Sequence, residues 1–137
     1  MGLDMYLTAR RKPHRIGEGA LETEAMYWRK ANAIHKWFVD NVQGGKDECQ
    51  EHLVTLEQLA ELRNVCAAVL ADKSKASTLL PPTSGFFFGS TEINDRYMQD
   101  VLNTAEKLDM LLCTVEVVGD TARSIWDDYD FYYCSSW

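Results

Sequence analysis

The spacing of apolar residues changes along this chain from the period of a strand to that of a helix and back, which restricts the fold more than any other feature. Residues 3–8 alternate apolar and polar side chains, as a strand with one buried face does. Residues 21–28 alternate in the same way, and the aromatic-rich tract 129–134 is typical of a terminal strand. Strands are therefore expected near both ends of the chain.

Three longer tracts between these ends have apolar residues at three- and four-residue steps, which predicts helices. The first begins near Lys30. The second begins at Thr55, where a glutamine three residues on, Gln58, completes the pattern of a capping box. The third begins near Ser90 or Thr91 and carries a long apolar stripe.

Shorter tracts are less regular. Residues 47–54 are expected to form a short strand, and residues 86–88, three aromatics between glycines, a short buried strand. Residues 114–118 either continue the preceding helix or form a strand. With no repeat or linker, residues 1–137 are expected to form a single domain of the α+β class. About three helices would pack on a small, mostly antiparallel sheet.

The composition favours a protein of the cytoplasm. Apolar residues make up 46% of the chain, enough for a core, yet no run approaches the ~18–20 residues that span a bilayer. The first residues lack the cations and apolar stretch of a secretory signal. Four separated cysteines without a C-x-x-C pair are typical of buried thiols in a reducing compartment. No membrane association is expected.

The charge is negative and unevenly distributed. The formal net charge is −7; residues 1–46 hold 8 Lys and Arg against 5 Asp and Glu, whereas residues 47–137 hold 6 against 16. Because affinity for nucleic acids depends on cations that neutralise phosphates, binding to DNA or RNA is disfavoured. An acidic surface suits a basic groove on a partner protein. The simpler interpretation is that the acidity maintains solubility.

Familiar catalytic and cofactor motifs are missing. The chain has no P-loop, no G-x-G-x-x-G, no H-E-x-x-H and no G-x-S-x-G pattern, so no cofactor is expected. Cys49 and His52 are spaced as two metal ligands. A structural zinc site needs four ligands, usually in two such pairs, and no second pair exists. We therefore expect no metal.

The tract from Trp28 to His35 has the strongest inventory for binding a ligand. Arg29 and Lys30 offer cations for phosphate or carboxylate, Trp28 a stacking face, and Asn32 and His35 hydrogen-bonding groups. Together they suit a nucleotide or another flat anionic ligand. The plainer interpretation is a set of surface charges beside a core tryptophan and a hydrogen-bonded histidine.

Two other segments are weaker candidates. Gly89, Ser90 and Thr91 would open a helix whose free N–H groups and dipole favour an anion, although Ser90 or Thr91 is more simply an N-cap. The last residue, Trp137, would close a pocket or touch a partner with its indole, or pack on the core of its own domain. Together the three segments are expected to form one ligand site.

Several segments resemble one group of proteins. They are the opening MGLDMYL, the run YWRKAN at residues 27–32, Leu80-Pro81, GFFFG at residues 85–89, and the ending SSW. Together they resemble small uncharacterised accessory proteins encoded by bacteriophages and prophages. The resemblance implies expression in the cytoplasm of an infected host bacterium. Small phage accessory proteins often counter host defences, so the resemblance also implies an anti-defence role, by association only.

Three functions follow as hypotheses. The first is a protein that binds, and by doing so sequesters, a small anionic or nucleotide-like ligand such as a host defence signal. The second is an acidic protein–protein inhibitor of a host defence protein. The third is a small enzyme using His35 as acid or base and Arg29 as an anion clamp, although no spacing demands catalysis. The sequence does not decide whether the protein is catalytic, and it leaves the oligomeric state open.

Overall fold

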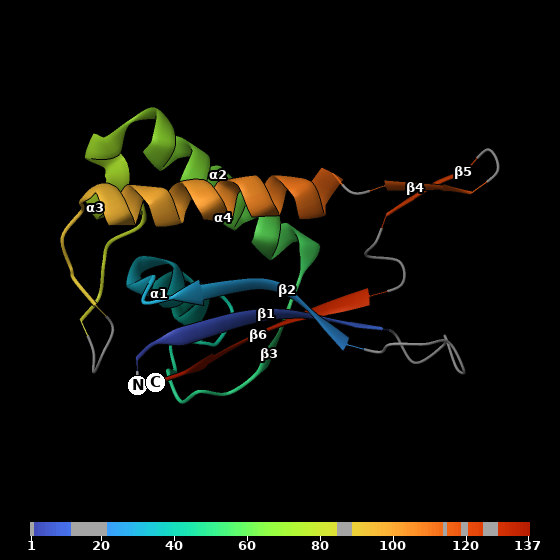
Figure 1. Cartoon of the computed structure of the whole chain (residues 1–137), viewed down its shortest axis with the longest axis horizontal. Coiled ribbons are helices and arrows are strands. Elements are labelled where there is room, and N and C mark those ends of the chain that lie inside the picture. Colours follow the sequence, from blue (N-terminus) through green and yellow to red (C-terminus); the bar gives the residue numbers. More distant parts are fainter. Residues whose placement is uncertain (1, 12–21, 85–88, 114, 119–120, 125–128) are drawn as a thin grey trace.

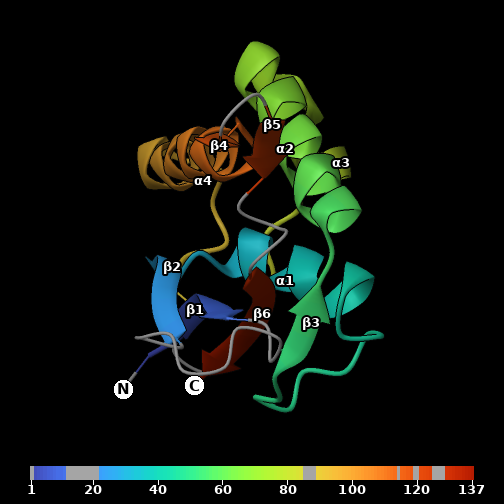
Figure 2. The ribbon, with the colours of Figure 1, turned by 90° about the vertical axis from the view of Figure 1, so that its right-hand side faces the viewer.

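Helices are layered on one side of an antiparallel sheet (Figures 1 and 2). The computed structural model describes residues 2–11, 22–84, 89–113, 115–118, 121–124 and 129–137. Their arrangement confirms the α+β class that the alternating periods predicted. Among the described helices, none is both long and apolar enough to cross a bilayer.

Strands from the two ends of the chain form the centre of the sheet. The strand order is β2–β1–β6–β3, and every neighbouring pair is antiparallel. In the central pair Asp4 lies opposite Ser136, so the two ends of the chain lie side by side, as Figure 1 shows. The four strands are β1 (Asp4–Arg11), β2 (Glu22–Arg29), β3 (His52–Val54) and β6 (Tyr129–Ser136).

Four helices and one 3-10 turn lie on the same side of this sheet (Figure 2). In both views α1 lies next to the sheet, whereas α2 and α4 pack on each other farther from it. The described part of the chain thus has one helix more than the three expected, because a short helix follows α2. The helices are α1 (Asn32–Asn41), α2 (Leu56–Ala71), α3 (Ala76–Leu79) and α4 (Asp95–Cys113), with the 3-10 turn at Lys73–Lys75.

Two helix starts differ from the predicted positions. The first helix was expected to begin near Lys30 and begins two residues later, at Asn32, because Lys30 has a φ of 55°, in the left-handed region. The third begins at Asp95 rather than at Ser90 or Thr91. There the Asn94 side-chain oxygen accepts the Tyr97 backbone N–H at 3.1 Å, as an N-cap residue does.

The shorter tracts also differ from expectation. The strand predicted for residues 47–54 is confined to β3, and residues 86–88 lie outside the described residues. The choice left open for residues 114–118 is decided for a strand over Val115–Val118, which form β4, whereas Thr114 lies outside the described residues. The strand β4 pairs with β5 (Thr121–Ser124), which was not predicted, in a separate two-stranded sheet.

The capping box predicted at the start of α2 is confirmed. The Thr55 hydroxyl accepts the Gln58 backbone N–H at 3.1 Å, and the Gln58 side chain accepts the Thr55 N–H at 2.9 Å. The two bonds satisfy donors that a helix start otherwise leaves free. The helix then buries Leu59, Leu62 and Val69 along the predicted stripe.

The face of the sheet toward the helices is the centre of the core. Leu3, just before β1, and Met5 and Leu7 of β1 alternate inward and are fully buried. On β6 the ring of Tyr133 stacks on Phe38 of α1, with ring centroids 3.9 Å apart. This stacking joins the last strand to the first helix, so the core depends on contacts between distant parts of the sequence.

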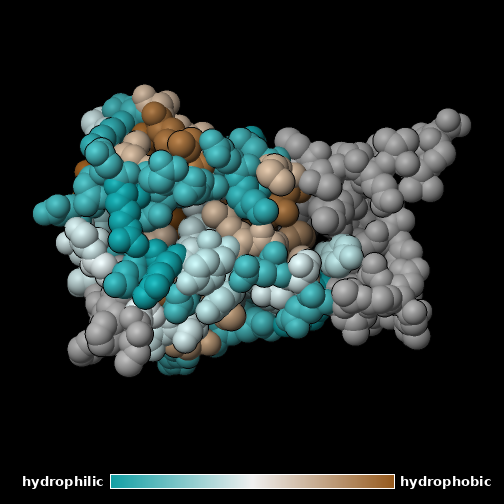
Figure 3. All heavy atoms as spheres, viewed as in Figure 1, coloured by the Kyte–Doolittle hydropathy of each residue, from teal (hydrophilic) through white to brown (hydrophobic). Residues whose placement is uncertain are grey.

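The opposite face of the sheet is polar. Arg10 donates to both carboxylate oxygens of Glu51 at 3.0 Å and to Glu22 at 2.9 Å, and its guanidinium lies 4.3 Å from the Tyr132 ring centroid. Tyr27 and Leu53 remain 44% and 51% exposed. Around the edge of the molecule, Figure 3 shows hydrophilic side chains over most of the described surface and apolar ones between α4 and β2.

Candidate functional site

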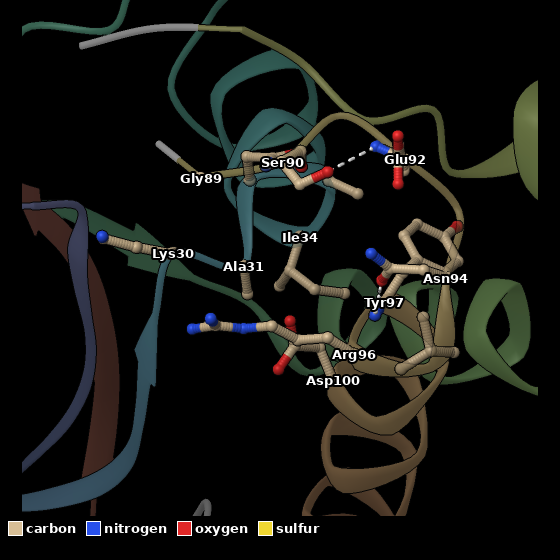
Figure 4. Close-up of a pocket in the computed structure, with 13 residues that line it drawn as sticks. Lys30, Ala31, Ile34, Gly89, Ser90, Glu92, Asn94, Arg96, Tyr97 and Asp100 are labelled. Atoms are coloured by element: carbon tan, nitrogen blue, oxygen red, sulfur yellow. Dashed lines mark hydrogen bonds between the residues drawn. The ribbon is translucent and has the colours of Figure 1, made fainter. Parts of the chain in front are cut away.

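A hollow lies where the start of α1 faces the start of α4 (Figure 4). It is a cavity of about 70 Å³ that opens to solvent. That volume is smaller than the roughly 300–1,000 Å³ of sites that enclose a drug-sized ligand, so the hollow can enclose only a small group of a ligand. Three segments line it: residues 30–34, the residues before α4 (Gly89, Ser90, Glu92 and Asn94), and the first turns of α4 (Arg96, Tyr97, Asp100 and Val101).

Asn32 holds two of these segments together. Its side-chain amide donates to the Ser90 carbonyl at 2.9 Å, and its side-chain oxygen accepts the Thr83 backbone N–H at 3.1 Å. The residue is only 5% exposed. Because both the N–H and the oxygen of this buried amide form hydrogen bonds, Asn32 holds Thr83 and Ser90 in place. Asn32 therefore positions the wall of the hollow.

Lys30 and Gly89 meet at the rim in unusual backbone conformations. Lys30 has a φ of 55° and donates its N–H to the Leu3 carbonyl at 2.7 Å, which turns the chain out of β2 toward α1. Gly89 has a φ of 88°, and a Cβ there would lie 3.2 Å from the Lys30 Cβ. Such a conformation costs a residue with a side chain on the order of 1–3 kcal/mol and persists where the surroundings enforce it. The rim is thus a fixed backbone feature.

Charges of both signs face the hollow. Within the described residues, neither Lys30 nor Arg96 forms an ion pair or a side-chain hydrogen bond. Figure 4 shows both side chains extending toward the same side. Asp100 lies one helical turn after Arg96; burial raises the pKa of its carboxyl, and the Arg96 charge opposes that shift. Glu92 lies near the opening and is exposed.

The inner wall of the hollow is apolar. Ala31, Ile34 and Val101 are at most 4% exposed, and the Tyr97 ring lies beside them. The Tyr97 hydroxyl donates to the Leu80 carbonyl at 2.7 Å, and burial raises its pKa to about 12. Tyr97 therefore remains a neutral phenol at physiological pH. Cations beside an apolar wall can hold a flat ligand that carries an anionic group.

Two residues predicted to bind the ligand lie elsewhere. Trp28 is 4% exposed and donates its indole N–H to the Thr104 hydroxyl at 2.8 Å, so its ring is part of the core. Arg29 points away from the core on the edge strand β2 and does not line the hollow. Trp28 is therefore a core tryptophan, as the plainer of the two sequence interpretations had it.

His35 and Trp137 belong to a second cluster. His35 is fully buried; its Nδ1 lies 2.6 Å from the Tyr133 hydroxyl and its Nε2 2.9 Å from Asp47 Oδ2. Trp137 donates its indole N–H to the other Asp47 oxygen at 3.0 Å. Burial, followed by the nearby Asp47 charge, raises the pKa of Tyr133 well above its usual value, so the phenol stays neutral. We assign Nδ1 as the acceptor of the Tyr133 hydroxyl, and Nε2 lies within ion-pair distance of Asp47.

This second cluster joins α1, the loop before β3 and the C-terminal strand. His35 is enclosed, so substrate has no access to its ring nitrogens in this arrangement. Among the described residues, no group of three or more His, Cys, Asp or Glu side chains is arranged to hold a metal ion. Cys49 itself is exposed and free.

An anion site was predicted at residues 89–91 because a helix was expected to start there, and the structure has no helix start at these residues. The N-terminus of α4 is four or more residues farther on, so the helix dipole does not act at Ser90. Gly89 and Ser90 nevertheless line the hollow, whereas Thr91 does not. The Ser90 hydroxyl accepts the Glu92 backbone N–H at 3.0 Å.

The structure thus brings Lys30, Asn32, Gly89 and Ser90 together, and separates them from Trp28, Arg29, His35, Thr91 and Trp137. Sequence reasoning missed Arg96 and Asp100. Their four-residue spacing places both on one helix face beside the predicted apolar stripe, which was the available signal. Comparison with known proteins finds no matching family model, no similar curated protein and no similar solved structure.

Proposed function

We propose that this protein binds a small anionic or nucleotide-like ligand in the hollow between α1 and α4. The observation that carries the proposal is the pair Lys30 and Arg96, which face one hollow without an ion-pair partner among the described residues. In a chain with a formal net charge of −7, two cations that share one hollow without an ion-pair partner among the described residues favour an anion there.

The two cations suit different parts of an anion. The guanidinium of Arg96 presents a planar fork that matches two oxygens of a phosphate or carboxylate, and Lys30 adds a compact charge. A flat ring would lie beside them at the opening of the hollow, next to its apolar inner wall. Asn32 and the strained rim keep the walls in place before binding, which lowers the entropy lost when the ligand enters.

The resemblance to phage and prophage accessory proteins gives the proposed setting. In the cytoplasm of an infected bacterium, a protein that holds a small nucleotide-like signal lowers its free concentration by mass action. Sequestration needs no catalytic group. His35 is enclosed and Arg29 is not among the residues that line the hollow, so neither supports the alternative of an enzyme built on those two residues.

The test is ligand capture followed by affinity measurement. Purified protein is incubated with a pool of nucleotides, washed and denatured, and the released compounds are identified by mass spectrometry. Calorimetry then measures the affinity of Arg96→Gln, which we expect to be more than about tenfold weaker, because a charge-assisted bidentate contact is lost. Lys107→Gln on the same helix and Arg29→Gln on β2 are the matched controls, since neither lines the hollow. Capture of no compound, with no thermal shift by any nucleotide, would contradict the proposal.

The outer face of the sheet favours a second candidate, the acidic protein–protein inhibitor. Tyr27 and Leu53 are exposed there beside the acidic side chains of Asp4, Glu22 and Glu24. A basic host protein would be held by complementary charge. Capture from host lysate at low salt and release at higher salt is expected for this function, whereas capture of nothing at low salt would contradict it.

A further inference from the structure

The hollow contains a carboxylate that an anion-binding site alone does not need. Asp100 is half-buried on α4 and lines the hollow with Arg96. Within the described residues its carboxylate oxygens receive no hydrogen bond and form no ion pair. Only its backbone carbonyl is engaged, by the Thr104 hydroxyl at 2.7 Å.

A half-buried carboxylate without hydrogen-bond donors costs free energy. Partial desolvation disfavours its charge unless donors satisfy its oxygens. In Figure 4 the carboxylate points to the same side as the Lys30 and Arg96 side chains, so a ligand held by these cations comes within its reach. The carboxylate would repel a second anionic group of that ligand. It would attract a group with N–H donors.

We infer that the ligand is a guanine nucleotide, or an analogue with the same donor edge, and that Asp100 accepts hydrogen bonds from its N1–H and 2-amino groups. This inference rests on the proposed function, because the phosphate is assigned to Lys30 and Arg96. The base lies at the opening of the hollow, next to the apolar inner wall that Ile34 and Val101 form.

The chemistry of the bases selects guanine. A carboxylate only accepts hydrogen bonds, and guanine presents two adjacent N–H donors that match its two oxygens. Adenine and cytosine each place an acceptor nitrogen beside a single amino group. Uracil flanks its one N–H with two carbonyls. A site that hydrogen-bonds a substrate group discriminates strongly against analogues lacking that group, because its own polar atoms are then left unpaired.

Calorimetry with three 5′-monophosphates tests the inference: guanosine, inosine and adenosine. Inosine retains N1–H and lacks the 2-amino group, so we expect affinities in the order guanosine, inosine, adenosine, with more than about tenfold between the first and last. For Asp100→Asn the preference for guanosine over adenosine should fall by at least about tenfold. Glu106→Gln, which removes an exposed carboxylate from the same helix outside the hollow, should keep the order.

The outcomes separate the two proposals. Equal affinity for guanosine and adenosine monophosphates would overturn the role of Asp100. If Arg96→Gln weakened the binding of both compounds equally, the anion site would still be supported. A preference for guanosine that survives in Asp100→Asn would also overturn the role of Asp100. Binding of none of the three compounds at millimolar concentration would overturn the guanine assignment, whereas the anion site stands or falls with capture from the whole nucleotide pool. Circular dichroism of Asp100→Asn shows whether a lost preference accompanies an intact fold.

Discussion

Tyr133→Phe isolates one contact of the buried cluster around His35. The phenylalanine keeps the ring stacked on Phe38, whose centroid is 3.9 Å away, and removes only the hydroxyl that lies 2.6 Å from His35 Nδ1. Both Tyr133 and His35 are fully buried, so water cannot replace the missing group without rearrangement. Removing one partner of a buried hydrogen bond costs about 1–3 kcal/mol.

That loss is large enough to measure. Unfolding entropy of about 2 cal/mol/K per residue means that 1 kcal/mol lowers the Tm of a chain of this length by roughly 3–4 °C. We therefore expect Tyr133→Phe to lower the Tm by roughly 3–10 °C. Urea denaturation followed by circular dichroism gives the change in free energy of unfolding, and calorimetry gives the Tm.

Tyr132→Phe is the matched control. Tyr132 is the neighbouring residue on β6, faces the polar side of the sheet and contacts Arg10 through its ring. Losing its hydroxyl should change the free energy of unfolding by less than about 0.5 kcal/mol. Equal stability of the two variants would refute the view that the Tyr133–His35 contact holds the C-terminal strand on α1.

Three further predictions concern other elements. Thr104→Val should lower the free energy of unfolding by about 1–3 kcal/mol in urea denaturation, because the buried Trp28 N–H loses its acceptor; unchanged stability would contradict this. Thr55→Ala should cost about 0.5–2 kcal/mol and speed amide exchange in the first turn of α2, and unchanged exchange there would count against the capping box. Burial raises the pKa of the Cys66 thiol to about 12, so little reactive thiolate forms at mildly alkaline pH. Iodoacetamide should therefore alkylate the exposed Cys49 first; peptide mass spectrometry showing the reverse order would refute the burial of Cys66.

The parts of the fold that local signals specify were predicted from sequence. Alternation within β1 and the capping box of Thr55 are determined by neighbouring residues. The start of α4 was missed because several capping residues precede it: Ser90 and Thr91 are as suitable as Asn94, and the sequence does not rank them. The strand β5 was missed because its four residues carry too little periodicity.

The site was predictable only in part. The proximity of Asn32 and Ser90 agrees with the hypothesis that two distant segments share one cavity. The burial of Trp28 depends on how β2 pairs with β1, including a register shift between Leu7 and Thr8, and strand pairing is not a local property. The role of Arg96 depends on which neighbour covers that face of α4. Such contacts arise from packing between elements and leave no distinct sequence pattern.

The most direct test is an NMR titration of isotope-labelled protein with guanosine monophosphate. The account predicts saturable amide shifts concentrated at residues 30–34 and 89–101, and their loss in Arg96→Gln. Shifts concentrated on the outer face of the sheet would contradict the claim that the hollow between α1 and α4 is the ligand site, and no shifts at millimolar guanosine monophosphate would contradict the guanine assignment.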